Sequence, residues 1–475
     1  MFGDRKLVPS DVLAGLILLS HKARREKEEG RDSQGIVGRT VFDQMGVSLV
    51  KVEVENDEGD TCLEIVSESS RISLDWGSVK HYYKYAAAAY GYMWWMMQRP
   101  LTHCCKLSFS IQCCGCRQTE DFFVEGDGML KPNLAAIKEM LKVTDKDIIM
   151  FDNRNMIEEV PFLLLADRDS KSLVISIRGT LSLHDMLTDL RGDPAQICSL
   201  SPEWTAHMGM VNCARYVMTR LHGQSTERER SFRGSGEETG SSKSHLTECL
   251  EREEFRDWKL VVTGHSLGAG TATILAFLLR EKYPDRDVLC YAYSPPGGLL
   301  SEAAAKESVK FTVSVLVGDD VIPRLSLRNI GTLSADINRS ISSCSLPKYQ
   351  VFGYGCLSCL CSTSRTPLSA ELDRLHPPGS LSSCQGDHAH AHQPPLSPHH
   401  PASQLISTPP MFLPGRVLHL QPVGDTEQYT VTERRREDFG EILVSPRMLS
   451  DHLPNHLDRV FKCCPDDLNV IPVLV

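Results

Sequence analysis

The sequence predicts an α/β protein with a mostly parallel central sheet and helices on both faces of that sheet. Short apolar segments bounded by polar turns alternate with helical patterns in the middle of the chain. Apolar side chains with helical spacing fill residues 269–282, between two of these segments. The apolar segments are typical of buried strands and comprise residues 160–166, 173–177, 258–263, 288–293 and 311–317. Strands that alternate with helices favour a parallel sheet covered on both sides.

Length and composition agree with a globular protein. The chain has 475 residues, enough for one core of roughly 250–300 residues with additions. Hydrophobic residues make up 41% and charged residues 24%, which is ordinary for a folded domain. Acidic residues outnumber basic ones by 61 to 51, so the net charge of −10 argues against nucleic-acid binding as the main function.

The pattern divides the chain into two regions and two inserts. Residues 1–150 form an N-terminal region that we expect to lie near a membrane, and residues 151–475 form the α/β domain. Residues 222–257 are polar and charged, while residues 331–410 are rich in Ser, Pro, His and Cys. We predict that both segments are long disordered inserts in the α/β domain.

An aromatic segment marks the N-terminal region. Residues 85–97 read YAAAAYGYMWWMM and lie between Lys84 and Arg99. The segment is too short to cross a bilayer, and the sequence has no run of 18 apolar residues elsewhere. Tyr and Trp favour the boundary between lipid and water, so one interpretation is a helix on a membrane surface with Trp94 and Trp95 in contact with lipid. The other interpretation is a buried core helix.

Cysteine usage indicates a reducing compartment. The chain has seventeen cysteines and no secretory signal, so we expect free thiols on the cytoplasmic side of a membrane. Two clusters lie at residues 104–116 and 356–361. The first would suit S-acylation next to the aromatic segment. Neither cluster has paired CxxC motifs with nearby histidines, so the sequence predicts no metal site.

The strongest chemical signal is the pentapeptide Gly264-His265-Ser266-Leu267-Gly268. It directly follows an apolar strand and opens a helical segment, which is the setting of a GxSxG nucleophile elbow. The glycines permit a sharp turn and close approach of the backbone. The motif therefore predicts the α/β-hydrolase fold, with Ser266 as an exposed nucleophile.

A serine hydroxyl needs a base, and the base needs an orienting acid. In this fold the acid follows the serine in the chain and the histidine comes last. Asp319 and Asp320 both stand at the end of a predicted strand, and either could be the acid. Nine histidines follow them, six of them in the second insert. Of the remaining three, His419 lies in a strand-like segment, and His452 fits a loop at the sheet edge better than His456.

The reaction would also need donors for an oxyanion. The N–H of Leu267, directly after the nucleophile, is the first donor that we expect. The second should come from an early junction of strand and loop, and Thr180 follows the strand that ends at residue 177. Thr180 can offer its N–H and its hydroxyl.

Several segments together resemble the class 3 lipase family, and within it the sn-1-specific diacylglycerol lipases, more the alpha than the beta form. The resemblance covers nearly the whole chain outside the two inserts. The segments are PSDVLAGLILL (9–19), AAYGY with the following cysteines, IRGTLSLHDMLTDL (177–190), HMGM (207–210), GHSLGAGTA (264–272), AYSPPGGLL (292–300), GDDVIPR (318–324), LPGRVLHL (413–420) and EILVSPRMLSDHLP (441–454).

The resemblance implies a function and roles for residues. It implies hydrolysis of the sn-1 ester of diacylglycerol to a fatty acid and a 2-acylglycerol such as 2-arachidonoylglycerol, without a cofactor in the chemistry. It selects Ser266 as nucleophile, Asp320 as acid and His452 as base. It also implies that residues 331–410 are a regulatory loop.

The resemblance further implies calcium stimulation and a place on the cytoplasmic face of the plasma membrane. The family begins with four membrane-spanning helices that this sequence lacks, so we expect a truncated product or an incomplete gene model. Three other departures stand out: GDD replaces Gly-Lys-Asp, the segment 222–257 is longer and more charged, and the pattern is lost from about Phe461 onward.

Overall fold

The computed structural model describes residues 12–20, 72, 74–98, 123–127, 131–156, 158–180, 194–224, 244–353, 409–423 and 428–465. The chain forms two compact units. The larger comprises Arg71–Asn329, Thr408–Ile442 and Arg447–Val475, and the smaller comprises Met1–Ser70, Ile330–Ser407 and Leu443–Pro446.

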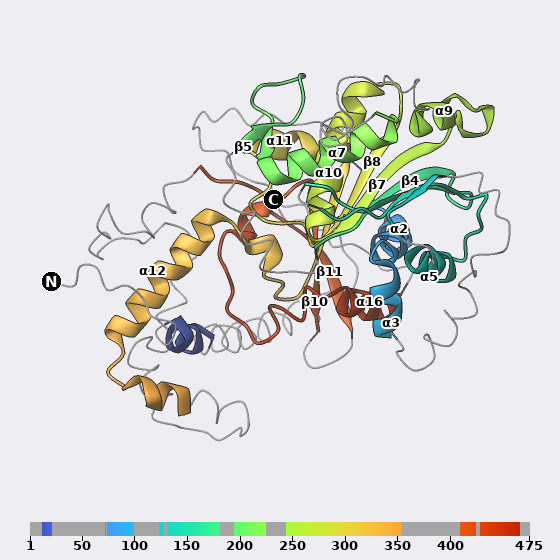
Figure 1. Ribbon diagram of the computed structural model, residues 1–475. Coiled ribbons are helices and arrows are strands. Elements are labelled where there is room, and N and C mark those ends of the chain that lie inside the picture. The colour runs from blue at the N-terminus through green and yellow to red at the C-terminus, as the bar shows by residue number, and fades with distance from the viewer. Residues whose placement is uncertain are drawn as a thin grey trace, which may run out of the picture. The chain divides into compact units, whose positions relative to one another are not determined.

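A nine-stranded sheet forms the centre of the larger unit (Figure 1). Its order is β1-β2-β3-β4-β7-β8-β9-β10-β11, and the five strands from β4 to β10 run parallel to one another. Antiparallel pairs join β2, β3 and β4 on one side and β10 and β11 on the other. The strands are β1 (Phe123–Glu125), β2 (Ile148–Asp152), β3 (Phe162–Asp167), β4 (Ser172–Ile177), β7 (Lys259–His265), β8 (Val288–Tyr293), β9 (Thr312–Val317), β10 (Arg416–Pro422) and β11 (Tyr429–Arg434).

The five predicted strands are therefore confirmed as β3, β4, β7, β8 and β9, and the predicted helix as α10 (Leu267–Lys282). The mostly parallel sheet and the α/β-hydrolase arrangement are confirmed with them. A second sheet pairs β5 (Pro194–Gln196) with β6 (Thr205–His207).

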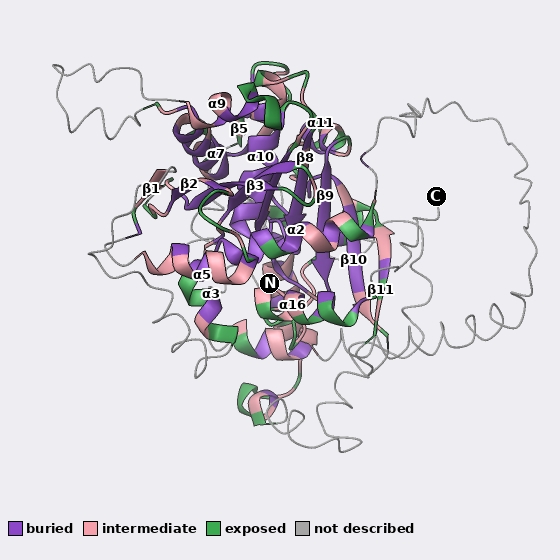
Figure 2. Cartoon of the chain, turned by 90° about the vertical axis from the view of Figure 1, so that its right-hand side faces the viewer, coloured by how far each residue is buried: buried purple, intermediate pink, exposed green. Residues whose placement is uncertain are grey.

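Both faces of the large sheet are covered, and nearly every residue of its inner strands is buried. On β3, Leu164 packs into one core cluster, whereas Leu163 and Leu165 pack into another. Such alternation follows from the two-residue period of a strand. The first cluster includes side chains of α7 (Met208–Leu221), α10 and α11 (Glu302–Ser308). The second includes side chains of α2 (Trp76–Ala88), α3 (Gly91–Gln98), α5 (Pro132–Leu141) and α16 (Pro454–Cys463), and Figure 2 shows the buried strands between these layers.

The N-terminal helices belong to this core, and the predicted contact of Trp94 and Trp95 with lipid is wrong. The exposed fraction is 3% for Trp94 and 6% for Trp95. Trp94 packs in the second core cluster and Trp95 packs against Ala136 of α5. The core-helix interpretation therefore describes α2 and the tryptophans of α3. The large hydrophobic side chains that α3 exposes are Tyr92, Met93 and Met97.

The domain boundary and the inserts also differ from the prediction. A boundary at residue 150 falls inside β2, and the larger unit begins at Arg71. The segment 222–257 is not a disordered insert throughout, since α9 (His245–Glu251) and η2 (Glu253–Phe255) bury Leu246 and Phe255 in the core. Cys249 and Leu250 are buried in the same cluster, so four side chains attach this end of the segment to the core. Residues 225–243 lie outside the described residues.

The segment 331–410 likewise begins with a helix rather than with disorder. Helix α12 (Leu327–Ser343) continues into it, and residues 348–353 are also helical. In the smaller unit, Val351 packs with Ala14 and Leu18 of the helical residues 12–20. Residues 354–408 and both cysteine clusters lie outside the described residues.

None of the helices that the structure describes combines the length and apolar character required to span a bilayer.

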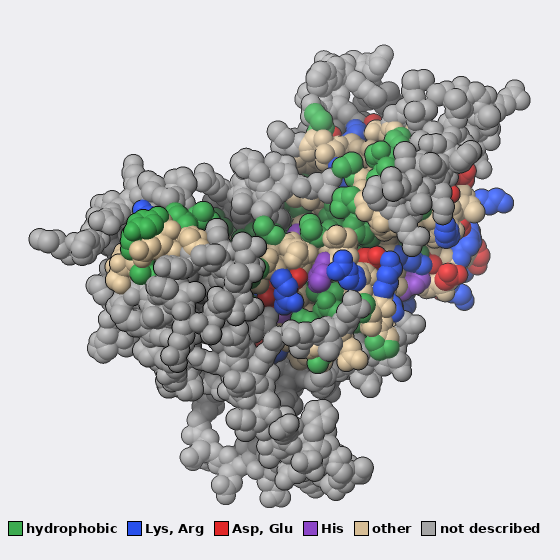
Figure 3. All heavy atoms as spheres, turned by 90° about the horizontal axis from the view of Figure 1, so that it is seen from below, with side chains coloured by type: hydrophobic (Ala, Val, Ile, Leu, Met, Phe, Trp, Pro, Cys, Tyr) green, Lys and Arg blue, Asp and Glu red, His purple; other side chains and the backbone are tan. Residues whose placement is uncertain are grey.

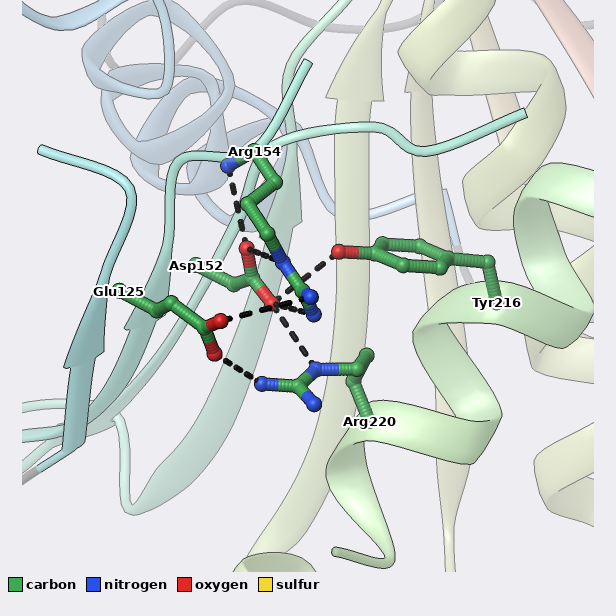
Figure 4. A network of polar contacts seen from close by, with 5 residues as sticks. All are labelled: Glu125, Asp152, Arg154, Tyr216 and Arg220. Carbon is green, nitrogen blue, oxygen red and sulfur yellow. Dashed lines mark hydrogen bonds and ion pairs between the residues drawn. The ribbon is translucent and has the colours of Figure 1, made fainter. Parts of the chain in front are cut away.

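Buried charges tie the sheet edge to α7 (Figure 4). The Asp152 carboxylate is fully buried and accepts hydrogen bonds from the Arg220 Nε at 3.0 Å and the Tyr216 hydroxyl at 3.1 Å. Arg154 donates to the same carboxylate, with Nη2 at 3.0 Å from Oδ2. Both arginines also pair with Glu125 of β1. Each buried charge thus has a partner of opposite sign, which burial requires.

We predict that Asp152→Ala lowers the free energy of unfolding by ~3–5 kcal/mol, because it leaves two arginines without their buried partner. Urea unfolding followed by tryptophan fluorescence measures this loss. Glu253→Ala is the matched control, because it breaks an exposed pair with Arg256. A loss no larger than that of the control would show that the network contributes little to stability.

Candidate active site

The turn between β7 and α10 holds Ser266 in an unusual backbone conformation. Its φ is 60° and its ψ is −129°, a region that non-glycine residues rarely occupy. Its N–H donates to the carbonyl oxygen of Tyr293 at 2.9 Å. A Cβ at Gly264 would lie 2.5 Å from the carbonyl carbon of Gly268. The two glycines therefore allow the strand and the helix to cross closely enough to form the elbow.

The structure brings the three predicted triad residues together. Nε2 of His452 lies 2.9 Å from Oγ of Ser266, and Nδ1 of His452 lies 3.1 Å from Oδ2 of Asp320. Ser266 and Asp320 are buried, and the His452 side chain is 14% exposed. This geometry lets the histidine accept the serine proton while the carboxylate orients the ring.

Asp320 rather than Asp319 faces the histidine. The second oxygen of Asp320 accepts the N–H of Ile322 at 2.9 Å, at the start of η3 (Ile322–Arg324). Asp319 points elsewhere, with its Oδ2 3.6 Å from Nη2 of Arg447. The turn requires Gly318, whose φ is 55°. The strand pattern left Asp319 and Asp320 as equal candidates for the acid, and the contact with His452 identifies Asp320.

The two other candidates for the base, His419 and His456, have hydrogen-bond or ion-pair partners other than Ser266. His419 is buried on β10, and its Nε2 lies 2.7 Å from the carbonyl oxygen of Gly318. Burial lowers the pKa of His419 to about 4. His456 pairs with Asp451, with Nε2 3.5 Å from Oδ1. Burial lowers the pKa of His456 as well.

The expected oxyanion donors lie beside the elbow. Leu267 is the first residue of α10, where the N–H groups of the first turn have no acceptor within the helix. Thr180 follows Gly179, and a Cβ at Gly179 would lie 3.3 Å from the Ser266 Cβ. The loop after β4 therefore passes directly over the nucleophile. The oxyanion roles of Leu267 and Thr180 remain predictions.

Two residues near the site were assigned no role from the sequence. Tyr90 lies between α2 and α3, and its hydroxyl oxygen is 2.9 Å from Nδ1 of His265. Asp451, directly before His452, is buried, and its Oδ2 accepts the N–H of Asp319 at 2.8 Å. This hydrogen bond joins the loop of the acid to the loop of the base. Asp451 is adjacent to His452 in the sequence, which was the one available hint of its role.

The described residues contain no group of three or more His, Cys, Asp or Glu side chains that could hold a metal ion. They therefore offer no fit for the calcium that the resemblance implies. Nucleophile, base and acid all come from the chain, so hydrolysis at Ser266 requires no cofactor.

We predict that His419 makes stability depend on pH between 6.5 and 4. Its pKa falls from the ordinary 6.5 to about 4 on folding, so the unfolded chain binds the extra proton in this window. The free energy of unfolding therefore decreases as the pH falls, by on the order of 3 kcal/mol from this residue.

Urea unfolding of the wild type and His419→Gln at several pH values measures this effect. The glutamine amide can still donate to the Gly318 carbonyl but does not titrate. The variant should lose less stability than the wild type between pH 6.5 and 4. Parallel curves for the two proteins would contradict the assignment.

Comparison with known proteins gives a consistent result. Residues 174–330 match the family model described as lipase (class 3). The chain is 31% identical to the human protein named diacylglycerol lipase-alpha, over 95% of this chain and 41% of that protein. It is 32% identical to the mouse protein named diacylglycerol lipase-beta, over 97% of this chain and 64% of that protein. The chain thus spans less than two thirds of the length of these relatives.

Among solved structures, a mono- and diacylglycerol lipase from Aspergillus oryzae superposes with a TM-score of 0.36 and 20% identity. The match covers 54% of this chain and 75% of the fungal chain. Residues 174–330, which include the nucleophile elbow, are thus a class 3 lipase segment, and the chain as a whole is similar to the proteins named diacylglycerol lipase.

Proposed function

We propose that the protein is a serine lipase that hydrolyses the sn-1 ester of diacylglycerol. The products would be a fatty acid and a 2-acylglycerol, such as 2-arachidonoylglycerol. The observation that carries the proposal is the continuous hydrogen-bonded chain from Ser266 through His452 to Asp320. The kind of lipid rests on the similarity to proteins named diacylglycerol lipases.

The first step would form an acyl-enzyme. Oγ of Ser266 attacks the ester carbonyl carbon while Nε2 of His452 takes the hydroxyl proton. The N–H groups of Leu267 and Thr180 would stabilise the negative charge on the carbonyl oxygen. His452 then gives its proton to the departing glycerol oxygen, and the C–O bond of the ester breaks.

The second step would release the fatty acid. A water molecule gives a proton to His452 and attacks the acyl carbon, and the proton returns to Oγ of Ser266 as the acyl bond breaks. In both steps Asp320 stabilises the protonated imidazole through Nδ1. His265 remains neutral beside it, because burial and then the neighbouring charge of His452 hold its pKa well below the ordinary range.

A substrate panel tests the proposal. We predict hydrolysis of 1,2-diacylglycerol with loss of the sn-1 chain, and slower release from a monoacylglycerol or a phospholipid with the same chains. Products separated by chromatography give the position of cleavage. Preferred hydrolysis of a monoacylglycerol or phospholipid would replace the proposed substrate, and an inert wild type that is folded would indicate an inactive membrane-associated fragment.

Asp320 and its neighbour Asp319 allow a variant of the proposed acid to be compared with a matched control in this assay. Asp320→Asn should lower kcat by on the order of 10⁴-fold, because it loses the charge that stabilises the imidazolium. Asp319→Asn changes the neighbouring residue, which faces Arg447, and should leave kcat near that of the wild type. Equal losses in the two variants would contradict the assigned acid.

We also propose that the protein acts at a membrane surface, on the cytoplasmic face of the plasma membrane, because diacylglycerol resides in membranes. The exposed fractions of Met93 and Met97 on α3 are 51% and 55%. They stand four residues apart and therefore share one face of the helix. Figure 3 shows exposed hydrophobic side chains beside Lys, Arg, Asp and Glu side chains, a mixture that suits a lipid headgroup region.

We predict that the double variant Met93→Gln, Met97→Gln binds lipid vesicles more weakly, because it removes apolar surface from the helix. Co-sedimentation with vesicles of phosphatidylcholine and phosphatidylserine measures binding. Hydrolysis of a soluble short-chain ester is the control and should not change. Wild-type binding by the double variant would exclude this face of α3 as the lipid contact.

A further inference from the structure

His265 lies next to the nucleophile and contacts the proposed base without touching the reacting atoms. It is the last residue of β7 and is 1% exposed. Its Nε2 lies 2.9 Å from the main-chain carbonyl oxygen of His452, and the two imidazole rings are 4.7 Å apart at their centres. The ring is therefore placed to hold the backbone of His452 through a hydrogen bond while it packs against the His452 ring.

The two contacts of His265 determine which nitrogen carries the proton. A carbonyl oxygen only accepts, so the N–H must be at Nε2, where it donates to His452. In a neutral ring Nδ1 then accepts, and the Tyr90 hydroxyl oxygen lies 2.9 Å from it. Burial raises the pKa of Tyr90, so the phenol keeps its proton and can donate it to the hydrogen bond.

Tyr90 reaches this position because the structure leaves room for its hydroxyl. Tyr90 is 4% exposed and lies at the junction of α2 and α3. A Cβ at Gly179 would lie 2.5 Å from the hydroxyl oxygen. The glycine before Thr180 therefore makes space for the phenol directly beside the elbow.

His452 needs such an anchor because it lies outside the helices and strands, although turn hydrogen bonds join its neighbours Asp451 and Leu453 to Arg447 and Ser450. It lies in a turn, two residues before α16 begins at Pro454. The side chain must satisfy Ser266 and Asp320 at the same time. A small displacement of the backbone would lengthen one of these contacts, and misplacement by about 1 Å can lower a rate on the order of 100-fold.

We propose that Tyr90 and His265 are positioning residues for the base His452: the Tyr90 hydroxyl donates to Nδ1 and anchors the His265 ring where its Nε2–H fixes the His452 carbonyl. The inference rests on the proposed function, since it requires Ser266 to react as an activated nucleophile. It makes the junction of α2 and α3 part of the catalytic apparatus, although neither side chain touches the substrate.

The test uses kcat and KM of the full chain on a soluble short-chain ester. Tyr90→Phe removes one hydroxyl and should lower kcat about 10-fold or more at unchanged KM, because the His265 ring loses the hydrogen bond that anchors its orientation toward the His452 carbonyl. Tyr349→Phe is the matched control, since that phenol is 71% exposed, and kcat should not change.

Two replacements of His265 separate positioning from packing. His265→Gln places an amide N–H where Nε2 stands and should retain most of kcat, whereas His265→Asn places its amide where Nδ1 stands and should not. Adding Tyr90→Phe to His265→Gln should cause no further loss, because the Nδ1 atom that the Tyr90 hydroxyl anchors is already gone.

Three results would overturn the inference: a Tyr90→Phe enzyme with wild-type kcat, equal kcat in the Gln and Asn variants, or a full Tyr90→Phe loss in the Gln background. These results concern the variants, whereas a failure of the proposed function would be seen in the wild-type protein itself. A wild type that reacts with a fluorophosphonate but spares diacylglycerol changes the substrate and leaves this test in force. A wild type inert to the fluorophosphonate overturns both proposals.

Discussion

The site depends on one crowded crossing of backbones at Ser266. The positive φ of this residue points its hydroxyl away from the sheet, and that conformation persists only if the strand before it and the helix after it are held in place. A Cβ at Gly268 would lie 2.8 Å from the carbonyl carbon of Arg178, so β4 presses on the same turn. Parallel pairing of β4 with β7 and of β7 with β8 fixes the strands that support it. The apolar cores on both faces of the sheet thus stabilise a strained turn.

The remaining parts of the site come from distant segments that meet at this edge of the sheet. Asp320 follows β9, while His452 comes from a loop 132 residues later. Two polar contacts hold that loop: the carboxylate of Asp451 to the acid loop, and Nε2 of His265 to the His452 carbonyl. Both contacts are partly buried, and removal from water strengthens a hydrogen bond and makes an unmatched polar group costly. The base is thereby tied to both the acid and the nucleophile.

Local patterns in the sequence were sufficient for the strands and the elbow. The apolar runs of β7 and β8 and the glycines around Ser266 each reflect a constraint that acts within a few residues. The choice of Asp320 came from the resemblance, and the structure agrees with it. Tyr90 could not be found in this way, because its importance arises from a contact 175 residues away along the chain.

Contacts between segments distant in the sequence also explain the wrong predictions for Trp94, Trp95 and the segment 222–257. Trp94 and Trp95 have the composition of a membrane boundary, but α5 and the core cover them, and composition cannot show what packs on a helix. The charged surface of α9 concealed the few apolar side chains that order it. A tertiary contact overrides local character in both cases.

Labelling with a fluorophosphonate probe tests the central claim most directly, because the probe reacts only with a serine that a base has activated. The account predicts that the folded wild type is labelled and that Ser266→Ala is not. Equal labelling of the two proteins, or a folded wild type that stays unlabelled, would contradict the assignment of Ser266 as the activated nucleophile.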